Sequence, residues 1–159
     1  YATQLKEKQR LRAQYNIREA QMRRAYLEAK RTEGQTGKNM VELLETRLDA
    51  LVLRAGFART IAQARQMVVH RHIMVDGKIV DRPSFRVKPG QTLQVKPKSQ
   101  TSVPFEIAAE GINQEALPAT PDYLDVDIAR LKATLVRRPK RAEVPVTCDV
   151  QMVVEHYSR

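Results

Sequence analysis

The hydrophobic residues of positions 44–55 recur at the spacing of an amphipathic helix, about 3.6 residues per turn. They are Leu44, Leu48, Leu51, Val52 and Ala55. Arg47 and Arg54 flank this stripe, two helical turns apart. We predict a single helix that buries its apolar side and holds the two guanidinium groups at the edge of the core. Gly56 follows and can end the helix in the left-handed conformation.

A second helix is predicted to begin at Thr60. Thr60 and Gln63 have the spacing of a capping box, in which two side chains satisfy the first free amides of a helix. Ile61, Ala64 and Val68 fall on one side of this helix. A different side carries Arg59, Gln63, Gln66 and His70. Any one of these residues can simply be solvated, and Gln63 can be spent on the cap. As a group, together with Thr60, we interpret them as part of a phosphate-contacting surface with four neighbouring arginines: Arg47, Arg54, Arg65 and Arg71.

Alternating apolar residues predict short strands after this helix. Asp76 and Gly77 stand between apolar runs, and this dipeptide is a strong signal for a tight hairpin. Residues 85–88 and 93–96 alternate again, with a Pro-Gly turn between them. The polar side of this region supplies further candidate RNA contacts: His72, Lys78, Arg86 and Lys88. His70 and His72 have no Cys, Asp or Glu at metal-binding spacing, so we expect no zinc site there.

The first third of the chain predicts basic helices. Residues 6–31 contain neither Pro nor Gly and carry an imperfect helical stripe among dense Arg, Lys and Gln. We predict one or two helices with a break near Tyr15 and Asn16. A basic helix can be merely solvated, but here the positive charge exceeds what solubility needs, which favours neutralisation of phosphates. The cations concerned are Lys6, Lys8, Arg10, Arg12, Arg18, Arg23 and Arg24.

The pattern loosens beyond residue 98. We predict short strands at residues 123–126 and 133–136 that extend the sheet, and a final helix at residues 150–157 that packs against the N-terminal helices. Between them lies a basic cluster that includes Arg137 and Arg138. The cluster is a surface patch in any case, and a second RNA contact is its functional interpretation.

These elements predict an α+β protein. We expect a helical domain formed by the two chain ends, residues 1–43 with 143–159. Beside it we expect a module of two short helices packed on a small, mainly antiparallel sheet, at residues 44–98. Residues 99–142 are expected to add loops and strands to that sheet.

The charge of the chain favours a polyanionic partner. There are 28 Lys and Arg against 18 Asp and Glu, a formal net charge of +10 and a pI near 10.0. Residues 1–38 hold 10 basic and 4 acidic residues, residues 39–98 hold 11 and 5, and residues 99–159 hold 7 and 9. A membrane is the competing polyanion, but the chain has no Trp, no helix suited to a membrane surface and no apolar run of about 18 residues. We therefore place the RNA contacts in the first two thirds of the chain.

The stretch from Arg47 to Val95 resembles the small RNA-binding module named after the fourth protein of the small ribosomal subunit. The same module occurs in some synthetases and pseudouridine synthases. Three flanking segments resemble the bacterial ribosomal members of that family, so that the resemblance covers nearly the whole chain. They are YATQLKEKQRLRAQY, GQTGKNMVELLETRLDALV and EVPVTCDVQMVVEHYSR.

The resemblance implies a structural protein of the cytoplasmic ribosome. It implies direct binding to the 5′ domain of small-subunit ribosomal RNA, nucleation of assembly, and roles where messenger RNA enters the subunit and in translational accuracy. The implied partners are that RNA, neighbouring small-subunit proteins, messenger RNA and the messenger of the protein's own operon. Because the chain begins at Tyr1, we expect it to lack the basic N-terminal segment of the family, which in some members binds zinc through cysteines. We expect no cofactor in the residues present.

Two other functions compete with this interpretation. Pseudouridine synthases use an Asp in an Arg-Leu-Asp setting, and the triplet at residues 47–49 invites the comparison. Here the triplet lies inside the module, and the roughly 60 residues that follow are too few for a catalytic domain, so we interpret Asp49 as a local partner of a neighbouring Arg or backbone group. A stand-alone RNA-binding regulator is the other alternative. The single cysteine, Cys148, is expected to be a small buried side chain. We identify no catalytic residue and expect no enzyme.

Overall fold

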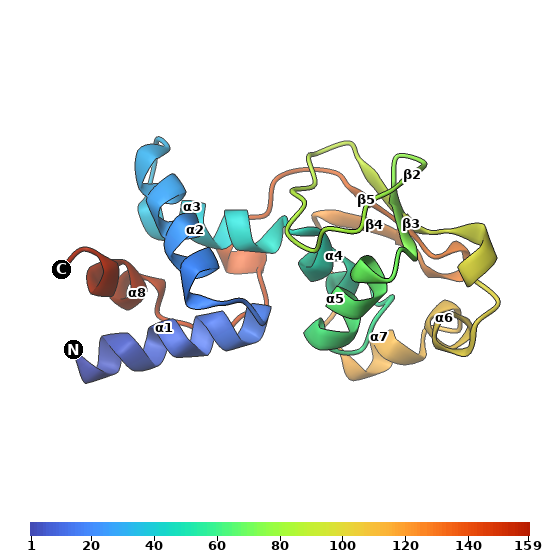
Figure 1. The fold of residues 1–159 in the computed structure, drawn as a ribbon, viewed down its shortest axis with the longest axis horizontal. Helices are drawn as coiled ribbons and strands as arrows, with labels where there is room; N and C mark the ends of the chain where they lie inside the picture. The colour runs from blue at the N-terminus through green and yellow to red at the C-terminus, as the bar shows by residue number, and fades with distance from the viewer. The chain divides into compact units, whose positions relative to one another are not determined.

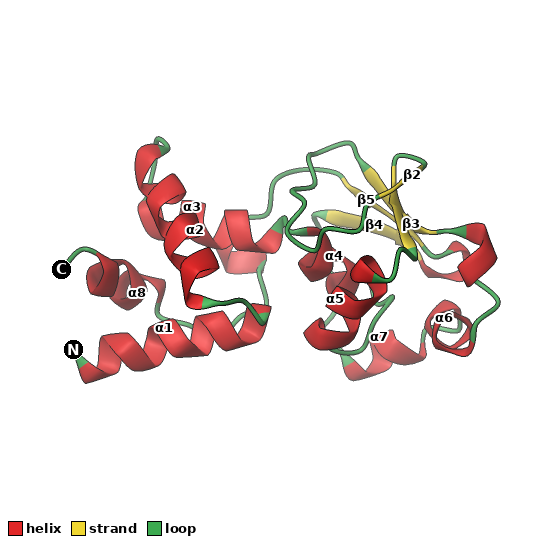
Figure 2. Cartoon of the chain, in the orientation of Figure 1, coloured by secondary structure: helices red, strands yellow, loops and turns green.

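The computed structural model describes all of residues 1–159, which form two compact units. Unit 1 consists of residues 1–45 and 140–159, and unit 2 of residues 46–139. Figure 1 shows the course of the chain through each unit, and Figure 2 shows that every strand belongs to unit 2. The two ends of the chain thus meet in one helical unit.

Unit 1 is built from four α-helices and one short 3-10 helix, η3 (Arg141–Glu143). The α-helices are α1 (Ala2–Tyr15), α2 (Glu19–Arg31), α3 (Thr36–Glu45) and α8 (Val150–Tyr157). Asn16 adopts the left-handed conformation that ends α1, at the predicted break. Helix α8 packs against α1 and α3, and α2 packs against α3. The apolar residues between them are buried, among them Leu11, Met22, Met40 and Val153.

Unit 2 carries a five-stranded sheet whose neighbouring strands are all antiparallel, in the order β2-β1-β3-β5-β4. The strands are β1 (Ile73–Val75), β2 (Lys78–Ile79), β3 (Thr92–Val95), β4 (Leu124–Asp127) and β5 (Lys132–Leu135). The helices are α4 (Leu48–Arg54), α5 (Ile61–Val69), α6 (Val103–Ala109) and α7 (Ile112–Ala116), with 3-10 turns η1 (Pro97–Ser99) and η2 (Ile128–Arg130). The α+β fold predicted from the sequence is confirmed.

The register of the sheet explains why the sequence alternates. Ile73 pairs with Val95, and Leu93 pairs with Ala133. All four side chains are buried on the face that contacts the helices, because successive residues of a strand point to opposite faces. The strands predicted beyond residue 98 are found as β4 and β5, within about one residue of the expected bounds.

Two predicted elements are wrong. The stripe at residues 44–55 is not one helix, because α3 ends at Glu45 and α4 begins at Leu48. Thr46 and Arg47 run alongside residues 85–87 instead: the Thr46 carbonyl accepts a hydrogen bond from the Val87 amide at 2.9 Å, and Arg47 and Arg86 form an isolated β-bridge. Residues 85–88 therefore do not form a strand of the sheet. Tertiary pairing of the backbone overrides the helical periodicity at this point.

A buried ion pair fixes the start of α4. The Nε of Arg47 lies 3.1 Å from Oδ1 of Asp49, and the Nη2 of Arg47 lies 3.1 Å from Oδ2 of Asp49. Only 6% of Arg47 and 1% of Asp49 are exposed to solvent. The Ala50 amide also donates to Oδ1 of Asp49, at 2.8 Å. The expectation that Asp49 serves a neighbouring Arg and the backbone is confirmed.

Substitution of Asp49 by Asn should destabilise unit 2 strongly. The change keeps the shape of the side chain but leaves the guanidinium of Arg47 buried without its counter-charge, which costs about 3–5 kcal/mol. Urea unfolding followed by circular dichroism measures the loss. The matched control is Asp127→Asn, which breaks an exposed pair with Arg130 at 3.7 Å and should cost less than about 1 kcal/mol. Equal losses in the two variants would contradict the role given to the buried pair.

Candidate RNA-binding surface

Helix α5 is held by a cap at its first turn. Oγ1 of Thr60 accepts a hydrogen bond from the Gln63 amide at 3.0 Å, and Oε1 of Gln63 accepts one from the Arg59 amide at 2.7 Å. In a capping box the side chain of Gln63 would accept a hydrogen bond from the backbone amide of Thr60. In the structure it accepts one from the backbone amide of Arg59 instead, one residue earlier. The hydroxyl of Thr60 and the side-chain carbonyl of Gln63 are thus engaged in capping the helix.

The side of α5 that faces away from the core is polar. Ala64, Met67 and Val68 are buried, whereas Gln66 and His70 are exposed and Arg65 is partly exposed. Arg59, just before the helix, is also exposed. The structure therefore places these candidate residues on one helix with donors directed outward.

The turns around the sheet hold further cations at the surface. Asp76 and Gly77 have φ angles of 48° and 83°, the combination that a two-residue hairpin with left-handed central residues requires. Lys78 follows on the edge strand β2 and is exposed, as are Arg86 and Lys88. Arg71 is exposed as well. Its Nη1 lies 3.2 Å from Oδ2 of Asp81, but such a surface ion pair does little to hold a side chain in place.

Arg47 must be withdrawn from the candidate surface. Its guanidinium is buried and paired with Asp49, so it cannot reach a phosphate without unfolding the start of α4. Arg54 lies in the last turn of α4 and is partly buried. Both arginines were predicted to lie at the margin of one long helix. That placement fails because the helix is split.

Lys8 must also be withdrawn from the candidates in unit 1. Only 6% of it is exposed, and its Nζ lies 2.8 Å from Oε2 of Glu19. Partial burial acts to raise the pKa of Glu19, but the hydrogen bonds from Lys8 and Tyr157 outweigh it and hold that pKa below its ordinary value. Lys8 therefore has a structural role between α1 and α2.

The other predicted cations of unit 1 lie at its surface. Lys6, Arg10, Arg23 and Arg24 are exposed. Nη1 of Arg10 lies 3.6 Å from Oε1 of Glu7. Arg12 is partly buried, and its Nε donates a hydrogen bond to Oε1 of Gln9 at 2.9 Å. These side chains form a second basic region, on the helices of unit 1.

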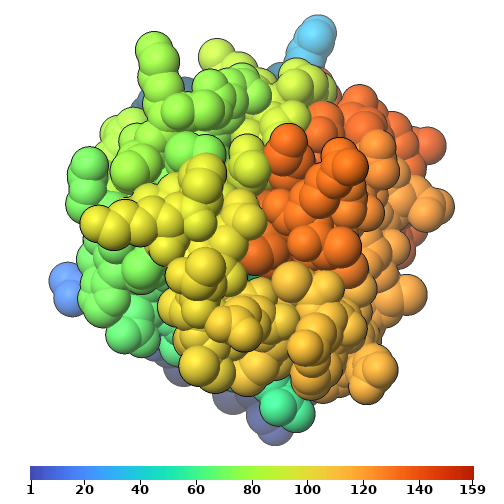
Figure 3. Space-filling view, turned by 90° about the vertical axis from the view of Figure 1, so that its right-hand side faces the viewer, coloured from blue at the N-terminus to red at the C-terminus, as the bar shows by residue number.

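Most exposed acidic residues of unit 2 lie in one segment of the chain. Residues 99–129 contain no Lys or Arg, yet six acidic residues of this segment are exposed. They are Glu106, Glu110, Glu115, Asp122, Asp125 and Asp127. Figure 3 shows one face of unit 2, with the green residues of α5 and the hairpin on one side and the orange residues of β4 and β5 on the other. Arg137 and Arg138 follow β5, the first partly buried and the second exposed.

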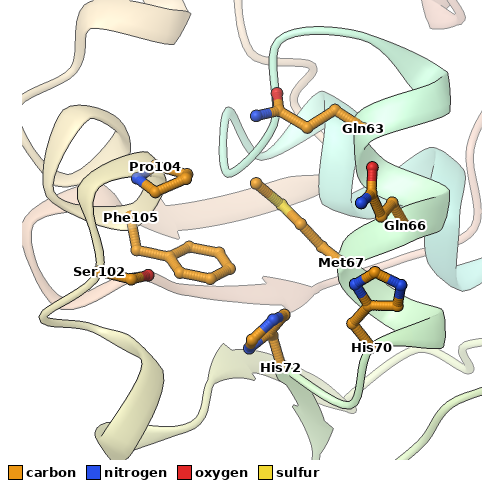
Figure 4. Close-up of a pocket in the computed structure, with 8 residues that line it drawn as sticks. All are labelled: Gln63, Gln66, Met67, His70, His72, Ser102, Pro104 and Phe105. Carbon is orange, nitrogen blue, oxygen red and sulfur yellow. The ribbon is translucent and has the colours of Figure 1, made fainter.

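A pocket that was not predicted lies between α5 and the start of α6 (Figure 4). Its volume is about 310 Å³, and its lining includes Met67, His72 and Phe105. Nδ1 of His72 lies 2.7 Å from Oγ of Ser99. Burial lowers the pKa of His72, and the charges of Lys96 and His70 lower it further. No sequence signal predicted the pocket, because Phe105 reaches it only through the tertiary fold.

The single cysteine is not activated, and no cluster of metal ligands is present. Burial raises the pKa of the Cys148 thiol to about 11, and Glu7 adds to the effect, so the thiolate is scarce at neutral pH. No group of three or more His, Cys, Asp or Glu side chains is placed to hold a metal ion. None of the helices is long and apolar enough to cross a membrane.

Comparison with known proteins assigns the first 93 residues to two family models. Residues 46–93 match the model of the S4 domain, and residues 1–45 match that of the ribosomal protein S4/S9 N-terminal domain. The chain is 72% identical over 159 residues to the small ribosomal subunit protein uS4 of Micrococcus luteus, and 70% identical over 159 residues to that of Beutenbergia cavernae. Each match covers 100% of this chain and 76% of the relative. The protein of the same name from Leifsonia xyli subsp. xyli is 68% identical over 158 residues, 99% of this chain and 76% of the relative. The chain therefore belongs to the uS4 family of small ribosomal subunit proteins.

Proposed function

We propose that this protein is a structural constituent of the small ribosomal subunit that binds the 5′ domain of its RNA directly and nucleates assembly there. The observation that carries the proposal is the exposed set of cations around α5 and the hairpin of unit 2. It includes Arg59, Lys78 and Lys88. These side chains belong to the part of the chain that matches the S4 domain.

Phosphate neutralisation is the main source of affinity in this proposal. Each Lys or Arg that contacts a phosphate releases a counterion, so binding weakens in proportion to the logarithm of salt. Cations placed at the start of a helix and on tight turns fit RNA helices by shape and backbone geometry rather than by sequence. The exposed cations of unit 1 provide a second set of contacts.

Further roles extend from this binding function. The protein lies where messenger RNA enters the subunit, contacts neighbouring small-subunit proteins and influences translational accuracy. Ribosomal proteins are mostly basic, and the exposed acidic residues 106–127 offer charge complementarity to such neighbours. Binding to the messenger of its own operon would use the same basic surface.

The alternative of an RNA-modifying enzyme is not favoured. Asp49 is buried and paired with Arg47, so its carboxylate faces the interior of unit 2 rather than a substrate. The relatives are named as ribosomal proteins. A stand-alone regulator would use the same cations, but residues 1–45 match a ribosomal protein domain.

The proposal is tested by the equilibrium affinity of the chain for the 5′ domain of small-subunit ribosomal RNA. The comparison is an unrelated structured RNA of equal length, across a series of salt concentrations. We expect a preference of at least about a hundredfold that persists at moderate salt, because a shaped site adds to the non-specific attraction. Equal affinities that fall together as salt rises would refute the proposal.

Charge reversal of Arg59 should weaken RNA binding without unfolding the chain. Its side chain is exposed, and only its backbone amide serves the cap of α5. For Arg59→Glu we expect about five- to tenfold lower affinity at low salt and a salt slope smaller by about 1.

The matched control for Arg59→Glu is Arg130→Glu. It makes the same change in net charge next to the acidic segment of unit 2, and the side chain of Arg130 is exposed beside Asp127. We expect the affinity of this control to stay within about twofold of the starting protein. If both variants lose affinity equally, the net charge of the chain matters and the surface around α5 does not.

A further inference from the structure

We propose that the pocket between α5 and α6 holds a single unstacked nucleobase of the bound RNA. The inference rests on the proposed RNA-binding function and adds a site to it. Phosphate contacts give affinity but carry no sequence information, whereas a base held in a pocket can. The pocket would thus let a mainly electrostatic surface recognise one nucleotide.

The size of the pocket fits one ring system. Its volume of about 310 Å³ lies at the lower end of the usual range for small-molecule sites. One wall comes from α5, through Gln63, Gln66, Met67 and His70. The opposite wall comes from Ser102, Pro104 and Phe105, and His72 closes one end. Figure 4 shows Met67 and the ring of Phe105 reaching toward one another across the space.

Apolar surfaces in the pocket suit the flat faces of a base. Phe105 and Met67 are only 2% and 5% exposed, so they form the closed apolar floor of the pocket. The ring of His70 is exposed and that of His72 is partly exposed, so these two rings are the ones open to a base. The rings of His72 and Phe105 lie 5.5 Å apart at an angle of 63°. Bases that leave a helix stack on aromatic side chains, and such contacts tolerate any base because every base has a π-face.

Polar groups around the pocket suit the edges of a base. The side-chain amide of Gln66 makes no hydrogen bond within the chain, although it lines the pocket. An amide offers a donor and an acceptor side by side and can therefore pair with two neighbouring atoms of a base edge. Nδ1 of His72 is engaged with Ser99, which leaves Nε2 for a ligand. An aliphatic side chain of a protein would leave these groups unpaired.

The charges near the pocket suit the backbone of an RNA strand. The amide of Lys96 donates to the carbonyl of His72 at 2.8 Å, so that Lys96 lies next to the pocket, with Lys98 two residues further. The lining contains no acidic residue. Glu106 follows Phe105 on α6 and is exposed, so the strand should leave the pocket toward the lysines and not across α6.

Nuclear magnetic resonance with mononucleotides tests the site directly. The chain is titrated with each of the four nucleoside 5′-monophosphates, and ribose 5-phosphate is the control that lacks a base. We expect shifts of the Gln66 side-chain amide and of the His72 and Phe105 ring signals with at least one nucleotide, and none there with the control. Shifts that are the same with ribose 5-phosphate, or that occur only at surface lysines and arginines, would overturn the proposal.

Two substitutions at Gln66 test the site within the RNA complex. Gln66→Ala removes the amide, and Gln66→Trp places a ring over the opening, at an exposed position where the fold tolerates either change. We expect about five- to tenfold lower affinity for the 5′ domain in both variants, with an unchanged salt slope because no phosphate contact is lost. Gln151→Ala is the matched control, an exposed helical glutamine of α8, and should change nothing.

The outcomes separate this inference from the proposed function. If the Gln66 variants bind RNA normally while Arg59→Glu still weakens binding, the pocket holds no base and the RNA-binding function stands. If Gln66→Trp instead weakens association with neighbouring small-subunit proteins, the pocket takes a protein side chain and the inference is overturned. If the unaltered chain shows no preference for the 5′ domain, it is the proposed function that fails.

Discussion

The buried ion pair between Arg47 and Asp49 is the constraint on which the rest of unit 2 depends. Two charges in a solvent-free interior are tolerated only when they are paired with one another. The carboxylate of Asp49 also accepts a hydrogen bond from the Ala50 amide, in the first turn of α4. The pair lies where the chain leaves the helical unit and begins to run alongside residues 85–87. It therefore determines where α4 begins and how the helices of unit 2 meet the segment before β3.

The surface of unit 2 follows from this buried framework. With Arg47 and Asp49 paired in the interior, the unit has exposed cations around α5, the hairpin and the turn before β3, and most of its exposed acidic residues lie in residues 106–127. A polyanion is attracted to one region and repelled from the other, so the charge pattern orients the RNA as well as attracting it. The pocket beside α5 adds the side-chain amide of Gln66 and aromatic rings next to this surface.

Local signals predicted the parts of the fold that depend on neighbouring residues. The Asp-Gly hairpin, the Thr60 cap and the break near Asn16 were correct because turn and cap chemistry acts within a few residues. Periodicity failed at residues 44–55, where pairing with a segment about 40 residues away splits the helix. The same limit explains the site: exposure of Arg59 and Lys78 was predictable, whereas burial of Arg47 and Lys8 and the approach of Phe105 to His72 depend on distant contacts.

Hydrogen exchange of the whole chain, alone and bound to the 5′ domain RNA, would locate the RNA on the surface of unit 2. We expect slower exchange of backbone amides at residues 59–72 and 78–88 in the complex, and unchanged exchange at residues 112–127, where the exposed charges are acidic. Protection of residues 112–127 together with unchanged exchange around α5 and the hairpin would contradict this expectation, because the RNA would then lie on the face that the charge pattern excludes.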